Sequence, residues 1–209
     1  MAETLGIQTG VLSPFLLLGW AITCILSGLG LRNGRLITLS VLGLWSVLLV
    51  RLDSVPLHAY IRGGTGDLSV TSLLLLSCSF YWRAGGRRLL SESSVVKVMS
   101  LALCTGLLMY PFALGLGPVD PYRWGWGSEL FVVSVCLVGA AFWLLEWEAV
   151  AVLAPGGVLA WQFGFLESSN LWDYLIDPWL FIASMVFMGR RWVMSGSAPG
   201  KAPSGLNGA

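Results

Sequence analysis

The sequence predicts an all-α fold, a polytopic bundle of transmembrane helices with about seven spans. Hydrophobic residues make up 56% of the chain and charged residues 11%, whereas about a quarter of the residues in a soluble domain are charged. Residues 4–31 and 98–119 contain no Asp, Glu, Lys or Arg. A helix of about 22 residues is roughly as long as the hydrocarbon core of a bilayer is thick, so each run is long enough to cross it.

The remaining spans follow along the chain with short connections. The first apolar run is too long for a signal-peptide core and has no basic region before it, so we expect a retained span. The second and third runs are short for a bilayer, and Arg51 and Arg83 at their ends extend them by snorkelling. The predicted spans are residues 11–31, 36–50, 68–82, 98–117, 129–146, 149–166 and 174–190.

These spans place residues 1–194 in one transmembrane helical domain. Residues 195–209 are rich in Gly, Ser, Pro and Ala, a composition that is typical of a disordered tail because it cannot bury a core.

The connection Glu146-Trp147-Glu148 leaves a six-span alternative open, because this inner turn carries no basic residue. In that alternative the fifth span runs on through both glutamates to Ala154. Burying two carboxylates in lipid costs several kcal/mol, so seven spans are favoured.

The basic residues orient the bundle with the N-terminus outside and the C-terminus in the cytoplasm. Outer loops hold only Arg51, Arg62 and Arg123. This asymmetry follows the positive-inside rule and predicts a multi-pass protein of a bacterial inner membrane. The inner loops and tail hold Arg32, Arg35, Arg83, Arg87, Arg88, Lys97, Arg190, Arg191 and Lys201.

The acidic residues are distributed the other way, and most of them lie in the outer loops. Loops 51–67, 118–129 and 167–178 combine acids with aromatic side chains, and the first two add arginine. The only histidine of the chain, His58, is suited to proton transfer near neutral pH. Arg62 and Arg123 are suited to binding a phosphate or carboxylate. The candidate catalytic residues are His58, Asp67 and Asp173, and the candidate substrate- or partner-binding residues are Arg62, Asp120, Tyr122, Arg123, Trp124, Glu167, Asn170, Trp172 and Asp177.

Structural roles are the alternative for several of these acids. Asp67 and Glu129 stand where spans begin and are suited to be helix caps. Asp173 and Asp177 have the i, i+4 spacing that places two side chains on one helix face, where like charges repel. A cation or an arginine between them would relieve this repulsion, and Arg62 and Arg123 are the candidates for such an ion pair between loops.

Residues 58–70, from His58 to Val70, resemble a motif of small uncharacterised bacterial inner-membrane proteins. In that motif an arginine is followed, after three residues, by Gly-Asp at the start of an apolar span, as Arg62 is followed by Gly66 and Asp67 here. This chain lacks the acid after the histidine and the proline after the arginine. The resemblance implies a membrane protein in which Arg62, Gly66 and Asp67 matter.

The sequence lacks the residues that several kinds of functional site require. A single histidine cannot provide bis-histidine haem ligation, and the four cysteines lack the spacing of a disulfide framework or a zinc site. The scattered basic residues do not form a nucleic-acid-binding patch. We therefore expect no cofactor, no metal and no nucleic-acid partner.

The favoured function is a non-enzymatic accessory subunit that lies in the lipid bilayer and binds a membrane-protein partner through its outer loops. The alternatives are a membrane enzyme acting on a lipid-linked or cell-envelope substrate at the periplasmic interface, and a small-solute transporter.

Overall fold

The computed structural model describes residues 2–31 and 33–196, with the backbone alone for residues 2–10 and 196. The chain is mostly helical, as the sequence predicts, and each predicted span contains most of one long helix. The long helices are α1 (Ala2–Gly28), α2 (Gly34–Leu48), α4 (Val70–Arg83), α5 (Glu92–Ala113), α6 (Glu129–Leu144), α7 (Glu148–Gln162) and α9 (Pro178–Gly196). The short elements are β1 (Arg51–Leu52), β2 (Val55–Pro56), α3 (Leu57–Thr65), the 3-10 helix η1 (Pro121–Gly125) and α8 (Trp172–Leu175).

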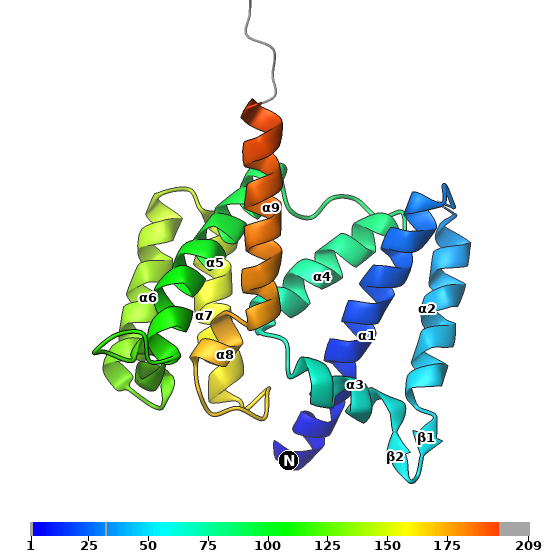
Figure 1. The fold of residues 1–209 in the computed structure, drawn as a ribbon, viewed down its shortest axis with the longest axis horizontal. Helices are drawn as coiled ribbons and strands as arrows, with labels where there is room; N and C mark the ends of the chain where they lie inside the picture. The colour runs from blue at the N-terminus through cyan, green and yellow to red at the C-terminus, as the bar shows by residue number, and fades with distance from the viewer. Residues whose placement is uncertain (1, 32, 197–209) are drawn as a thin grey trace, which may run out of the picture.

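The short elements gather at one end of the bundle, as Figure 1 shows. We call this the loop-rich end and define it as residues 51–69, 114–128 and 163–177. The turn after α1, segment 84–91 and turn 145–147 lie at the opposite end (Figure 1). The chain thus alternates between the two ends in the way that the charge distribution predicts.

The helices form two groups, which Figure 1 shows side by side. In one group α1 packs against α2, α3 and α4, and in the other α5 packs against α9 and α7, while α6 packs against α7. Helix α4 also contacts α7 and α8, so the groups meet near the loop-rich end. The fully buried residues there include Leu68, Leu171 and Tyr174, which places the best-packed part of the molecule beneath the loops.

The continuous helix through Glu146 and Glu148 that the six-span alternative requires does not occur in the structure. Helix α6 ends at Leu144 and α7 begins at Glu148. Between them Glu146 has a φ of 60°, a left-handed conformation that a helix cannot contain. The break leaves both carboxylates at a helix end instead of inside a long helix.

Residues 51–67, predicted only as a loop, contain a hairpin and helix α3. Strands β1 and β2 pair antiparallel, with Arg51 opposite Pro56 and Leu52 opposite Val55. Asp53 and Ser54 at the turn have φ values of 49° and 73°, the combination that a two-residue hairpin turn of the primed type requires. The all-α prediction therefore needs a small correction at this hairpin.

The predicted acidic caps at Asp67 and Glu129 are wrong. Ser69 caps α4 by accepting a hydrogen bond from the backbone N–H of Ser72, and Ser128 caps α6 in the same way. Serine is a strong capping residue because its hydroxyl oxygen reaches the free N–H groups of the first turn. Glu129 is the first residue of α6, where its charge still favours the helix dipole.

Two helical stretches are long and apolar enough to cross a bilayer, Val11–Gly28 and Glu92–Ala113. Helices Gly34–Leu48 and Glu129–Leu144 are apolar but shorter. The number of membrane crossings therefore stays a prediction.

Of the predicted tail, Ser195 and Gly196 end α9, whereas residues 197–209 lie outside the described residues, as do Arg32 and Lys201.

Candidate functional site

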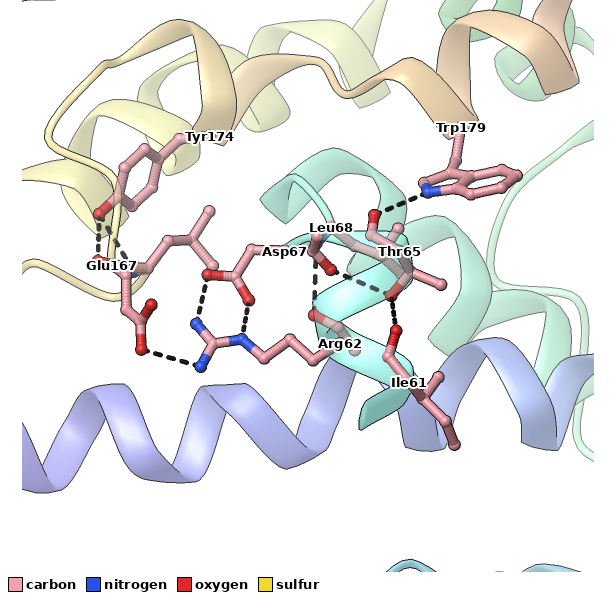
Figure 2. Close-up of polar contacts among 11 residues, drawn as sticks. Ile61, Arg62, Thr65, Asp67, Leu68, Glu167, Tyr174 and Trp179 are labelled. Carbon is pink, nitrogen blue, oxygen red and sulfur yellow. Dashed lines mark hydrogen bonds and ion pairs between the residues drawn. The ribbon is translucent and has the colours of Figure 1, made fainter. Parts of the chain in front are cut away.

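Arg62 on α3 forms the centre of a polar network at the loop-rich end (Figure 2). Its Nε lies 2.6 Å from Oδ1 of Asp67 and its Nη2 lies 2.7 Å from Oδ2, so the pair is bidentate. Its Nη1 donates to Oε1 of Glu167 at 2.8 Å. These hydrogen bonds, first those to Asp67, raise the pKa of Arg62 above its ordinary value. Arg62 is therefore a permanent cation neutralised by two carboxylates.

The Arg-x-x-x-Gly-Asp spacing has a backbone explanation. Helix α3 ends at Thr65, and Gly66 has a φ of 70° and a ψ of −173°, a region that only glycine adopts readily. The N–H of Gly66 donates to the carbonyl of Arg62 at 2.8 Å. The chain thus turns back sharply enough for Asp67 to face the guanidinium. The ion pair therefore requires the same three residues that the sequence motif contains, Arg62, Gly66 and Asp67.

Two aromatic residues fix the segments around this network (Figure 2). Trp179 on α9 donates from Nε1 to the carbonyl of Thr65 at 2.8 Å. The hydroxyl of Tyr174, a fully buried residue, accepts from the N–H of Leu166 at 3.0 Å and donates to its carbonyl at 3.0 Å. Segments from α3, α8 and α9 are therefore held together around the Arg62–Glu167 ion pair.

Asp177 joins the starts of α4 and α9. Its Oδ2 accepts from the N–H of Ser69 at 2.9 Å, from the hydroxyl of Ser69 at 2.6 Å and from the hydroxyl of Ser72. Its Oδ1 accepts from the N–H of Leu180 at 2.9 Å. The residue is only 3% exposed, and two helix N-termini stabilise the buried carboxylate.

A second polar cluster connects η1 to the segment before α8. The hydroxyl of Tyr122 lies 3.0 Å from both carboxylate oxygens of Asp173, and Oδ2 of Asp173 also accepts from the hydroxyl of Ser168. Burial, followed by the charge of Asp173, raises the pKa of Tyr122 above its ordinary value. The phenol therefore stays protonated at physiological pH and acts as the donor.

Asn170 is fully buried and completes this connection. Its Nδ2 donates to the carbonyl of Tyr122 at 3.0 Å, and its Oδ1 accepts from the N–H of Trp172 at 2.9 Å. The indole of Trp172 donates to the carbonyl of Pro121 at 3.0 Å. At Gly125 a Cβ would lie 1.7 Å from Oδ1 of Asn170, so only glycine fits against this amide.

Of the predicted residues in and next to η1, Tyr122 bonds to Asp173, whereas the others cap the element or are exposed. Asp120 caps η1 by accepting from the N–H of Tyr122 at 3.0 Å. Arg123 is exposed, and Trp124 and Trp126 are 53% and 57% exposed. These exposed side chains stand on a segment whose backbone is held by Asn170 and Trp172.

His58 on α3 is separate from both predicted catalytic carboxylates. Asp67 is paired with Arg62, and Asp173 is bonded to Tyr122. The Nδ1 atom of His58 is buried and has no hydrogen-bond partner among the described residues. Burial, and then the charge of Arg62, lowers the pKa of His58 below 6.5. The imidazole is therefore neutral at pH 7, with Nδ1 free to accept a proton.

Asp173 and Asp177 do not share a helix face, so that prediction is wrong. Helix α8 ends at Leu175, and Ile176 is extended with a φ of −146°, which separates the two carboxylates. The predicted ion pair between loops does exist, but it joins Arg62 to Glu167.

The hydroxyl donors to Asp177 and Asp173 were not among the predicted site residues. They are Ser69, Ser72 and Ser168. A serine immediately before an apolar run was the available signal for Ser69, because that is the position of an N-cap. Ser168 has no comparable signal, since its partner is fixed by the fold of its own loop.

The described residues contain no group of three or more His, Cys, Asp or Glu side chains that could hold a metal ion. The site is thus a set of internally satisfied polar clusters, one buried imidazole nitrogen without a partner, and an exposed aromatic surface. The chain matches no model of a known protein family, no curated protein and no solved structure.

Proposed function

We propose that this chain is a multi-pass protein of a bacterial inner membrane and serves as a non-enzymatic accessory subunit that binds a partner protein through its loop-rich end. The observation that carries the proposal is that the conspicuous polar groups of this end bond to one another, while Arg123 and Trp124 remain exposed on a rigid segment.

Large apolar side chains on the outer faces of the helices support residence in a membrane. On α6 alone Leu130, Leu137 and Leu144 are 78%, 65% and 83% exposed. Contiguous apolar surfaces of this kind are rare on soluble monomers, because exposing them to water is unfavourable. Contact with lipid chains avoids this exposure. The excess of Arg and Lys at the end opposite the loop-rich end supports the proposed orientation.

The surface formed by Arg123, Trp124 and Trp126 supports binding of a protein partner. Trp and Arg are enriched among the residues that dominate binding energy at protein interfaces. The bonds of Asn170 and Trp172 to η1 hold this surface in one conformation, so little conformational entropy is lost when a partner binds.

Native mass spectrometry of the protein extracted from its own membranes in a mild detergent tests this proposal. We expect a second polypeptide in a fixed ratio, released when Trp124 is changed to Ala. The matched control is Trp192→Ala, which removes an even more exposed tryptophan near the far end of α9 and leaves the complex intact. Recovery of the protein alone from undisturbed membranes contradicts the accessory-subunit proposal.

The unpartnered Nδ1 of His58 favours a second candidate, a membrane enzyme acting on a lipid-linked or envelope substrate. A neutral imidazole next to a guanidinium is suited to act as a general base near a bound anion. His58→Gln at unchanged protein level separates the two candidates, because it abolishes the activity of an enzyme and leaves a docking subunit functional. A lipid-linked adduct that is lost in Arg62→Ala supports the enzyme.

A further inference from the structure

An apolar groove lies between the two helix groups and extends from the start of α4, beside the loop-rich end, to segment 84–91. Its lining comes from α1, α4, α5, α9 and segment 84–91, and its volume is about 660 Å³. Pockets for organic ligands have volumes of roughly 300–1,000 Å³. Its walls include Leu76, Val95, Met99, Leu180, Ala183 and Phe187.

The interior of the groove offers almost nothing to a polar ligand. Of its hydroxyl groups, Ser72 donates to Asp177, and Ser79 accepts from the indole of Trp20. The lining begins at Leu68, just before α4, and follows this helix to Trp82. The 14 residues of α4 span about 21 Å. One leaflet contributes about 15 Å of hydrocarbon, so the groove is long enough for an acyl chain.

Positive charge is concentrated where the groove ends at segment 84–91. The guanidinium carbon of Arg88, a lining residue, lies 4.2 Å from the centre of the Trp82 ring. Nearby, Nε of Arg83 is buried without a hydrogen-bond partner. Among the described residues the carboxylate of Glu92 is paired with Arg191 at 2.6 Å, and neither Arg83 nor Arg88 has a carboxylate within ion-pair distance.

We propose that this groove binds one acyl chain of an anionic phospholipid of the inner leaflet, with the phosphate held by Arg88. A guanidinium stacked on tryptophan keeps its N–H edge free for bidentate contact with phosphate oxygens. Segment 84–91 lies at the end opposite the loop-rich end (Figure 1), at the level of the cytoplasmic headgroups. The inference rests on the membrane residence and orientation proposed above, and is independent of any partner protein.

The test is native mass spectrometry of the full-length protein in mild detergent with added phosphatidylglycerol or phosphatidylcholine. We expect one tightly retained phosphatidylglycerol and about tenfold weaker retention of phosphatidylcholine. Arg88→Gln, an exposed position that should not disturb folding, weakens phosphatidylglycerol binding about tenfold, as the loss of one charge-assisted contact predicts. Ala183→Trp fills the groove and has the same effect. Arg190→Gln, an equal change of charge on α9 outside the lining, has none.

Equal retention of both lipids, or an equal loss in Arg88→Gln and Arg190→Gln, overturns the lipid site. An increase of the thermal unfolding midpoint on adding phosphatidylglycerol provides a second measurement for variants that fold. Lipid retained without a partner protein contradicts the accessory subunit and supports the lipid site. A partner protein recovered without lipid supports the accessory subunit and contradicts the lipid site. Recovery of the protein in the aqueous fraction of lysed cells overturns the membrane residence on which both proposals depend.

Discussion

Arg62 and Glu167 are 105 residues apart in the chain, yet Nη1 of the arginine lies 2.8 Å from Oε1 of the glutamate. The arginine belongs to the helix group around α1, and the glutamate follows α7 in the other group. This ion pair therefore ties the two groups together at the loop-rich end, next to the bidentate pair of Arg62 with Asp67.

Changing Arg62 to Lys lowers the free energy of unfolding by about 1–3 kcal/mol, because an ammonium group keeps the charge but loses the bidentate geometry around a mostly buried carboxylate. Glu167→Gln costs less than about 1 kcal/mol, since the glutamate side chain is 67% exposed. Denaturant unfolding in detergent micelles, followed by circular dichroism, measures both. Equal costs contradict the central role of the Arg62–Asp67 pair.

Asp177→Asn lowers the free energy of unfolding by about 2–4 kcal/mol, because an amide cannot accept hydrogen bonds at both positions of the buried carboxylate. Asp53→Asn is the control at an exposed turn and has little effect. The same unfolding measurement applies. A stable Asp177→Asn protein shows that Ser69 caps α4 without the carboxylate.

His58 makes the stability depend on pH in one direction. Its folded pKa lies below the ordinary value of 6.5, so the unfolded chain binds the proton first as the pH falls. The free energy of unfolding therefore decreases as the pH falls through 6.5 towards the folded pKa, and is unaffected by this group at higher pH. His58→Gln removes this part of the slope. Because the chain has one histidine, its NMR titration measures the folded pKa directly, and a value above 6.5 contradicts the buried neutral imidazole.

Glu146→Gly stabilises the protein by about 0.5–1 kcal/mol, because glycine adopts the left-handed conformation at this turn without steric cost. The matched control, Glu148→Gly, places glycine in the first turn of α7 and destabilises the helix. Thermal unfolding midpoints in detergent distinguish the two variants. A loss of stability in Glu146→Gly indicates that the glutamate side chain makes a contact that outweighs its backbone strain.

The helices were predictable because their signals are local. Uncharged runs such as residues 98–119 and the charged break at Glu146 define segments without any knowledge of the fold. The Arg62–Asp67 pair was not predicted, although the motif that singles out both residues and the intervening Gly66 is local. The capping residues were mistaken by one or two positions, because the serines next to the first turns, Ser69 and Ser128, cap α4 and α6 in place of the nearby acids.

The contacts between distant segments were not predictable. Nothing near Ser69 indicates that its hydroxyl donates to Asp177, which follows 108 residues later, because that contact depends on how α4 packs beside α9. The choice of Glu167 over Asp173 as the partner of Arg62 likewise depends on contacts between distant segments, because Asp173 is bonded to Tyr122 on η1. The polar groups therefore had to be placed in space before structural and exposed roles could be distinguished.

The carboxylate of Asp177 also affects the order in which the chain can be completed. Asp177, which accepts hydrogen bonds at the start of α4, is synthesised only after α5, α6 and α7. A nascent chain that stops before residue 177 therefore leaves Ser69 and Ser72 without this acceptor. The hydrogen bonding at the start of α4 is therefore complete only after Asp177 and the start of α9 have packed against it. Truncation before residue 177 therefore removes α9 and also leaves the hydrogen bonding at the start of α4 incomplete.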